Sequence, residues 1–170
     1  MSPTTVIGRE EELATISRLY ESERSEFLAI YGRRRVGKSF LVEEALEKKI
    51  SFMAVGLYQK IDKDNPEKVE SYRQKQLAHF YESLQEYGLQ KEGNPAPTSW
   101  MEALKLLKKL LQSKRTRRKV VFIDELPWLD TPRSNFLKAL EMFWDNATST
   151  NRDLIIQGLS GYRTSRQVEI

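Results

Sequence analysis

A glycine-bounded loop constrains the fold of this chain more than any other part of its sequence. The loop, Gly-Arg-Arg-Arg-Val-Gly-Lys-Ser at positions 32–39, follows the apolar run at 27–31 and leads into an amphipathic segment at 40–46. A short apolar run bounded by a turn signal predicts a buried strand, and the segment after the loop predicts a helix. Strand, glycine-bounded loop and helix in this order are typical of a phosphate-binding P-loop. The alternative is a surface turn that merely matches the pattern.

The residue types in this loop suit the binding of a polyphosphate. Gly32 and Gly37 permit a backbone geometry in which successive amide groups turn toward phosphate oxygens. Lys38 supplies a charge to the outer phosphates, Ser39 supplies a hydroxyl ligand for Mg²⁺, and the positive end of the helix dipole points at the anion. The three arginines are explained equally well as solvated loop charges. We expect nucleotide contacts from Gly32, Arg33, Arg34, Arg35, Val36, Gly37, Lys38, Ser39 and Phe40.

A second stretch with residues suited to metal binding and catalysis lies at 120–125. Four apolar residues, Val-Val-Phe-Ile, come directly before Asp124 and Glu125. Open parallel sheets bind ligands at the carboxyl ends of their strands, so this strand would carry both acids to the nucleotide. We expect Asp124 to hold Mg²⁺, directly or through water, and Glu125 to polarise the water that attacks the terminal phosphate. The alternative is a buried strand that ends in an acidic turn.

Composition excludes several other classes of protein. The 170 residues, of which 39% are apolar, are enough for one domain with one core. The chain has no cysteine and one histidine, which excludes a disulfide framework, a thiol nucleophile and most zinc sites. No apolar stretch reaches the roughly 18 residues that cross a membrane, and the first residues lack the pattern of a secretory leader. We therefore expect a cytoplasmic protein without a membrane partner.

The other elements follow from hydrophobic periodicity and turn residues. We expect a helix with Leu13, Ile16, Leu19 and Tyr20 on its buried face, a strand at 50–55 buried on both faces, and a helix from Glu67 to a stop at Gly88. Thr98 or Ser99 should cap a helix that directs Trp100, Leu104, Leu107 and Leu111 toward the core. Thr131 should cap a helix with Pro132 in its first position and Phe136, Leu140, Phe143 and Trp144 buried, and a fourth strand should follow at 154–158.

Positive charge is concentrated before the strand at 120–123. The run Lys-Arg-Thr-Arg-Arg-Lys at 114–119 is typical of a solvated loop, and the alternative is a contact with nucleic acid. The formal net charge of +4 is compatible with a polyanionic partner without requiring one.

Together these stretches resemble the AAA-type ATPases common in archaea and in some anaerobic bacteria, which are related to origin-recognition initiators and signal-transducing NTPases. The resemblance covers about residues 6–157 and rests on Ile-Gly-Arg-Glu at 7–10, the loop at 31–39, Ser-Trp at 99–100, and Phe-Ile-Asp-Glu-Leu-Pro-Trp at 122–128. It implies a three-layer α/β P-loop NTPase fold with a parallel sheet, ATP and Mg²⁺ as ligands, and catalytic roles for Lys38 and Glu125. It also implies that the box with Ile7 and Arg9 folds over the adenine.

The chain departs from this family toward its end. The fourth strand of such ATPases ends in a small polar sensor residue, for which Ser160 and Gln157 are only weak candidates. Family members continue into a fifth strand, an arginine-bearing segment, a helical lid and a further domain. We therefore expect a partial core domain at 1–158 and an irregular tail at 159–170. Without a fifth strand the P-loop strand would lie at a sheet edge, which predicts weakened nucleotide affinity, little hydrolysis by the isolated chain and self-association through that edge.

Two functions from different classes follow. The first is Mg²⁺-dependent ATP binding, with hydrolysis in the complete parent protein. The second is a module that binds DNA or a protein partner, with nucleotide as a conformational switch. A small-molecule kinase ranks third, because Glu125 directly after Asp124 and the Gly-Arg-Glu box favour hydrolysis.

Overall fold

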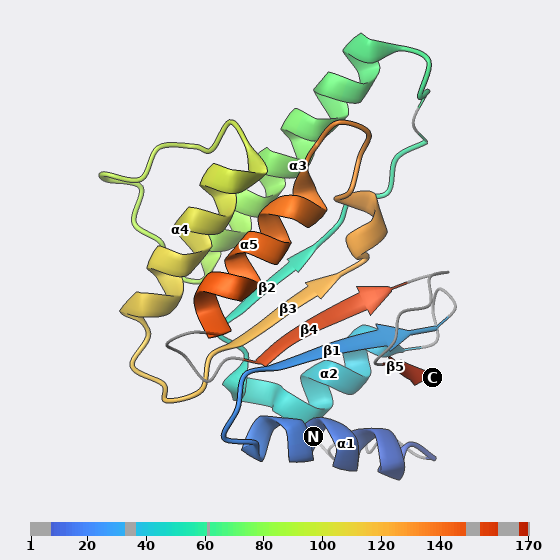
Figure 1. Cartoon of the computed structure of the whole chain (residues 1–170), viewed down its shortest axis with the longest axis vertical. Helices are drawn as coiled ribbons and strands as arrows, with labels where there is room; N and C mark the ends of the chain where they lie inside the picture. The colour runs from blue at the N-terminus through green and yellow to red at the C-terminus, as the bar shows by residue number, and fades with distance from the viewer. Residues whose placement is uncertain (1–7, 33–36, 61, 149–153, 160–166, 170) are drawn as a thin grey trace, which may run out of the picture.

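Helices cover both faces of a parallel sheet in the computed structural model, which describes residues 8–32, 37–60, 62–148, 154–159 and 167–169 (Figure 1). Within these residues the strands are β1 (Glu26–Tyr31), β2 (Phe52–Val55), β3 (Val120–Asp124), β4 (Leu154–Leu159) and β5 (Gln167–Glu169). Their spatial order is β2-β3-β4-β1-β5, and every pair of neighbours is parallel. The helices are α1 (Glu10–Glu21), α2 (Lys38–Leu46), α3 (Pro66–Glu86), α4 (Trp100–Ser113) and α5 (Phe136–Thr148), with short 3-10 helices η1 (Glu47–Lys49) and η2 (Leu126–Trp128). The predicted three-layer α/β fold is confirmed.

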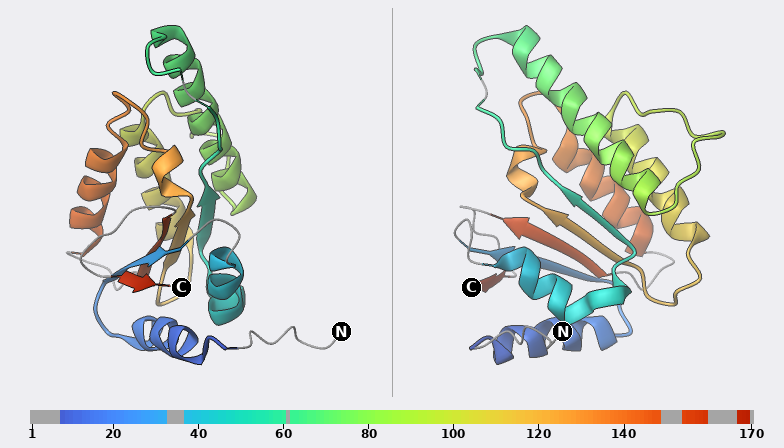
Figure 2. Two further views of the ribbon diagram at one scale, coloured as in Figure 1. Left: turned by 90° about the vertical axis from the view of Figure 1, so that its right-hand side faces the viewer. Right: turned by 180° about the vertical axis from the view of Figure 1, so that it is seen from behind.

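Successive side chains of the central strands point to opposite faces of the sheet, and both faces are buried. In β3, Val120 and Phe122 pack with α1 and α2, whereas Val121 and Ile123 pack with α3, α4 and α5. Figure 2 shows the same division, with the two groups of helices on either side of the sheet. The expected inward face of α1 is confirmed, since Ile16 is buried and Leu13, Leu19 and Tyr20 pack around it.

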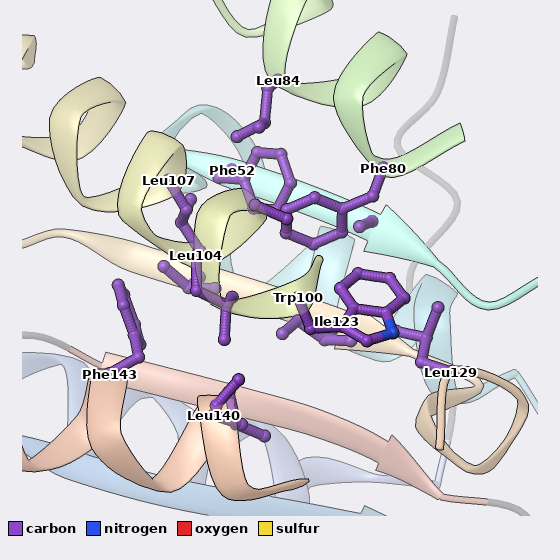
Figure 3. Packing of buried hydrophobic residues seen from close by; sticks show 14 of the residues in the cluster. Phe52, Phe80, Leu84, Trp100, Leu104, Leu107, Ile123, Leu129, Leu140 and Phe143 are labelled. Atoms are coloured by element: carbon purple, nitrogen blue, oxygen red, sulfur yellow. The ribbon is translucent and has the colours of Figure 1, made fainter. Parts of the chain in front are cut away.

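The larger core cluster is centred on Trp100 at the start of α4 (Figure 3). Its ring makes edge-on contacts with Phe80 of α3 and Phe136 of α5, at centroid distances of 5.4 and 4.9 Å. Leu104 and Leu107 extend this contact along α4. The predicted buried face of α4 is therefore confirmed, and it joins the three helices of this layer.

The start of α5 differs from its prediction. The helix begins at Phe136, not at Pro132, and the residues from Thr131 to Asn135 form a turn in which Arg133 and Asn135 have positive φ. The hydroxyl of Ser134 accepts a hydrogen bond from the Phe136 amide. A helix starting at Pro132 would need right-handed φ values through this turn. The prediction of a helix start from Thr131 and Pro132 was therefore wrong. The predicted burial of Phe136, Leu140 and Phe143 is confirmed, whereas Trp144 is only half-buried.

The prediction that the second strand is buried on both faces was wrong. Phe52 and Ala54 are buried against α3 and α4, but Met53 is half-buried and Val55 is 37% exposed. The reason is its position at one end of the spatial order, where only β3 pairs with it. An edge strand has less cover than a central one, and its apolar sequence alone does not reveal this.

The largest difference from expectation is at the other end of the sheet. We expected an irregular tail and an open edge at β1, but β5 pairs with β1 through Ala29–Gln167, Ile30–Val168 and Tyr31–Glu169. The P-loop strand therefore lies between β4 and β5, where the resemblance placed a fifth strand. Three residues are too few to show a strand period, so the pairing had no signal in the sequence. This removes the basis for self-association through that part of the edge.

Candidate functional site

The site forms where β1 and β3 end, on either side of β4. Tyr31 at the end of β1 pairs with Leu159, and Ile123 near the end of β3 pairs with Gln157. Because all three strands are parallel, the loop after β1 and the acids at the end of β3 reach the same edge of the sheet. Carboxyl ends of strands in open parallel sheets are where ligands bind.

The start of α2 places a positive charge at this edge. Gly37 caps the helix with φ of +83° and ψ of +28°, a left-handed conformation that glycine adopts without steric cost. Lys38 follows as the first helical residue and is only 5% exposed, and its Nζ donates a hydrogen bond to the carbonyl of Gly32 at 3.2 Å. The ammonium group and the positive end of the helix dipole therefore coincide, which favours an anion.

A hydrogen bond joins the two stretches that the sequence singled out. The hydroxyl of Ser39 donates to Oδ2 of Asp124, 85 positions later in the chain. Asp124 is 5% exposed, and its Oδ1 accepts a hydrogen bond from the Glu125 amide at 2.8 Å. A hydroxyl and a carboxylate in contact are the oxygen donors that Mg²⁺ prefers. Among the described residues, no group of three or more His, Cys, Asp or Glu is arranged so that it could hold a metal ion.

Glu125 has a backbone conformation that is uncommon outside glycine. Its φ of +51° and ψ of +39° lie in the left-handed region, at the point where β3 turns into η2. The turn is closed by the Trp128 amide, which donates to the Glu125 carbonyl at 3.0 Å. Such a conformation persists only where the surroundings impose it, and it directs Glu125 away from the line of the strand.

Gly56 at the end of β2 lies against this turn. Its amide donates to the Asp124 carbonyl at 2.9 Å, and a Cβ at this position would lie 2.3 Å from the carbonyl oxygen of Glu125. Only glycine allows this approach of the two main chains. Gly56 was not among the predicted site residues, although a glycine directly after a predicted strand is the available signal.

Two further residues near the site were also missed. Tyr72 and Gln76 of α3 are 2% and 1% exposed, and both contact the main chains of Leu57 and Trp128. In the sequence, Tyr72 is one of the apolar residues that recur at helical spacing between Glu67 and Gly88. The overlooked signal is Gln76, which lies one helical turn later and places an amide on that apolar face.

Part of the predicted site lies outside the described residues, namely Ile7, Arg33, Arg34, Arg35, Val36 and the weak sensor candidate Ser160. The other candidate, Gln157, belongs to β4 and pairs with Ala29 and Ile123. Phe40 is 44% exposed in the first turn of α2. Arg9 occupies the N-cap position of α1 without a capping hydrogen bond from its side chain. Figures 1 and 2 show α1 beside α2, and both helices begin near the edge of the sheet where the strands end.

The basic run at 114–119 lies in the loop before β3, at the opposite end of the strands. Arg118 is 8% exposed and donates to the carbonyls of Arg24 and Leu19 at 2.6 and 2.7 Å. Lys114 donates to the Tyr87 carbonyl, and Lys119 donates to the Lys114 carbonyl at 2.8 Å. Half of the run therefore binds the protein's own main chain, which favours a structural role over a surface for nucleic acid.

The sequence model of a protein family, described as an ATPase domain predominantly from Archaea, matches residues 7–167 of this chain. An uncharacterised protein of Methanocaldococcus jannaschii is 30% identical over 157 residues, which is 91% of this chain and 29% of that protein. An uncharacterised ATP-binding protein of the same organism is 40% identical over 43 residues, which is 25% of this chain and 73% of that protein.

Two solved structures share the fold at low sequence identity. The Drosophila origin recognition complex bound to DNA superposes with a TM-score of 0.59 at 16% identity, over 99% of this chain and 44% of that one. A Walker-type ATPase of Pyrococcus abyssi superposes with a TM-score of 0.57 at 20% identity, over 97% of this chain and 53% of that one. The chain thus covers about half or less of the length of each of these two chains and of the first relative.

Among the described helices, none combines the length and the apolar composition that a membrane span requires.

Proposed function

Because the chain belongs to the family of ATPase domains found predominantly in Archaea, we propose that it binds ATP with Mg²⁺ at the carboxyl edge of its sheet and that this site is built for hydrolysis. The observation that carries the proposal is the hydrogen bond between Ser39 and Asp124. It joins the helix that follows the glycine-bounded loop to the end of a strand more than eighty residues away. A surface turn that matches the loop pattern by chance has no reason to meet a buried carboxylate.

In this proposal each residue has a separate task. The amides of the loop and the ammonium of Lys38 bind the phosphates, which is consistent with the burial of Lys38 at the start of α2. Ser39 and Asp124 would hold Mg²⁺, which neutralises charge on the outer phosphates when it is bound. The left-handed turn at Glu125 would direct its carboxylate toward the attacking water.

Hydrolysis then needs one proton acceptor and one leaving group. A bond forms between the water oxygen and the γ-phosphorus, the bond from that phosphorus to the bridging oxygen of ADP breaks, and Glu125 accepts the proton of the water. A cation that stabilises the transferred group would come from a residue outside this set or from a neighbouring subunit.

The test is thermal unfolding with and without Mg²⁺ and ATP. Ligand at 100 times its dissociation constant adds about 2.7 kcal/mol, which should raise the midpoint by about 5–10 °C. Lys38→Ala should abolish this shift, whereas Lys48→Ala, which removes an exposed lysine beyond the far end of α2, should keep it. Glu125→Gln should keep the shift and lose turnover measured by phosphate release. A wild-type chain without a shift would refute ATP binding, and normal turnover by Glu125→Gln would remove Glu125 from its role.

The second candidate remains a module in which nucleotide switches the binding of DNA or a protein. It is supported by the net charge of +4 and by the shared fold with the origin recognition complex, whose structure contains DNA. The internal hydrogen bonds of Arg118, Lys114 and Lys119 weaken it. Binding of a DNA duplex that falls steeply with salt would support it, because phosphate contacts release counterions.

A further inference from the structure

Two buried polar side chains on α3 connect this helix to the candidate site. Tyr72 and Gln76 are one helical turn apart and almost fully buried. Burying an amide or a phenol is unfavourable unless its polar atoms form hydrogen bonds. Both side chains satisfy this requirement with main-chain groups of two separate segments, one after β2 and one at the end of η2.

Gln76 uses all of its polar groups in these contacts. Its Oε1 accepts from the Leu57 amide at 3.0 Å, and its Nε2 donates to the Leu57 carbonyl at 2.8 Å. The same Nε2 lies 3.3 Å from the carbonyl of Trp128. One amide side chain therefore binds Leu57 on both sides of its backbone and also holds the last residue of η2.

Tyr72 repeats the connection one turn earlier. Its hydroxyl donates to the Leu57 carbonyl and lies 3.3 Å from the Trp128 carbonyl. Burial raises the pKa of Tyr72 above its ordinary value, although a hydrogen bond with Gln76 offsets part of this effect. The phenol therefore keeps its proton at neutral pH and stays a donor.

The two segments held in this way lie on either side of Glu125. Leu57 follows Gly56, whose amide donates to the carbonyl of Asp124, the residue before Glu125, and Trp128 closes the turn that Glu125 begins. In Figure 1 the chain after β2 and η2 run next to each other beyond the strand ends. Displacement of either segment would change the left-handed conformation at Glu125.

We propose that Gln76 and Tyr72 are positioning residues that fix the direction of the Glu125 carboxylate through the main chains of Leu57 and Trp128. The inference rests on the proposed function, because it assigns the pair an effect on the water-activating residue. It makes α3 one of the elements on which the geometry of Glu125 depends, while phosphate binding by the loop and Lys38 is independent of it. Loss of the pair should therefore separate the two halves of the site.

The variants are Gln76→Leu and Tyr72→Phe, and the matched control is Tyr81→Phe. Tyr81 also lies on α3 and also donates its hydroxyl to a loop carbonyl, that of Asn94 at 2.7 Å, and the hydrogen bonds of the described residues do not join it to Leu57 or Trp128. Tyr72→Phe removes only an oxygen atom, so it provides the test if Gln76→Leu fails to fold.

The measurement is hydrogen exchange with and without Mg²⁺ and ATP, in the peptides that contain 37–46 and 125–129. In the wild type and Tyr81→Phe, nucleotide should slow exchange in both peptides. In Gln76→Leu and Tyr72→Phe it should slow exchange at 37–46 as before, whereas protection at 125–129 should fall about fivefold, as expected for one hydrogen bond of ordinary net strength. In turnover assays kcat should fall with an unchanged dissociation constant for ATP.

Each other outcome gives a definite answer. No protection of either peptide in the wild type would refute the proposed function itself. Protection of the wild type at 37–46 alone, or equal behaviour of Tyr72→Phe and Tyr81→Phe, would overturn the positioning role and leave ATP binding intact. Loss of protection in both peptides would show that the pair supports the domain as a whole, which would also overturn the inference.

Discussion

At the scale of single residues, the site depends on one position that has no side chain. Gly56 brings the end of β2 so close to Glu125 that a methyl group would overlap the Glu125 carbonyl and lie 3.1 Å from Cβ of Trp128. The obstacle on the carbonyl side is backbone, which cannot rotate away. The position of Glu125 is thus set by packing of main chain on main chain, in addition to its own hydrogen bonds.

Gly56→Ala should therefore destabilise the fold and impair catalysis together. We expect a loss of about 1–3 kcal/mol in the free energy of unfolding, the usual cost of overpacking, measured by urea denaturation. Turnover should fall further than this loss of stability explains, because η2 must move. Gly93→Ala is the control, since its added methyl group meets nothing within 4 Å and only its φ of +74° is strained. Equal turnover in the two variants would contradict the role of Gly56.

At the scale of elements, α4 is held by the hydrogen bonds at its first turn. The hydroxyl of Ser99 accepts from the Glu102 amide at 3.2 Å, and Oε2 of Glu102 accepts from the amide and hydroxyl of Thr98 at 2.7 and 3.0 Å. This reciprocal arrangement satisfies amides that the helix itself leaves unpaired. It fixes the start of the helix that carries Trp100 into the core. Of the two predicted capping residues, Thr98 and Ser99, Ser99 is the one that caps the helix.

These contacts predict a pH-dependent stability. The amide of Thr98, followed by its hydroxyl, lowers the pKa of Glu102 from its ordinary 4.5. A lowered pKa in the folded state means that the ionised carboxylate contributes stability above pH 4.5 and that this contribution is lost as pH falls through the folded value. Glu102→Gln should therefore be less stable than the wild type at neutral pH, and the difference should shrink below pH 4.5.

Denaturant unfolding at several pH values measures this difference. The control is Glu92→Gln. Glu92 lies on the loop before Thr98, and within the described residues its carboxylate forms no hydrogen bond or ion pair. The control should follow the wild type at every pH. A constant difference between Glu102→Gln and the wild type across the range would show that the carboxylate charge is not what stabilises the helix start.

At the scale of the whole molecule, the P-loop strand is enclosed on both sides. β1 pairs with β4 along all six of its residues and with β5 along Ala29–Tyr31, the half that leads into the loop. The strand that positions Gly32 and Lys38 is therefore held by main-chain hydrogen bonds from two neighbours. The segment responsible for the second set comes from the last residues of the chain.

Removal of β5 should create the open edge that the sequence suggested. A variant that ends at Leu159 leaves Ala29–Tyr31 paired with β4 alone, and an unpaired apolar edge promotes association. We expect sedimentation of this variant to depend on concentration, and the thermal shift with Mg²⁺ and ATP to decrease. A shortened chain that stays monomeric and binds ATP like the full chain would show that β5 contributes nothing to the site.

The fold and half of the site could be predicted because their signals are local. The apolar runs of β1 and β3, the glycines around 32–37 and the acids at 124–125 each follow from residue type and spacing within a few positions. The prediction failed for the start of α5. Thr131 and Pro132 have the residue types of a helix start, but the positive φ of Arg133 and Asn135 delays the helix until Phe136. It also missed Gly56, Tyr72 and Gln76, whose partners lie on other elements.

By itself, the sequence indicated the five α-helices and four of the five strands that the structure describes, and a loop typical of polyphosphate binding. Hydrophobic periodicity, turn residues and the conformational freedom of glycine are signals that involve residues close together in the chain. Only the tertiary structure decided that Ser39 meets Asp124, that α3 reaches the turn at Glu125, and that Gln167–Glu169 completes the sheet. Those contacts join segments far apart in the chain and depend on the order of the strands, which no local pattern records. The pairing of β5 also uses main-chain groups, which are the same for almost every residue type.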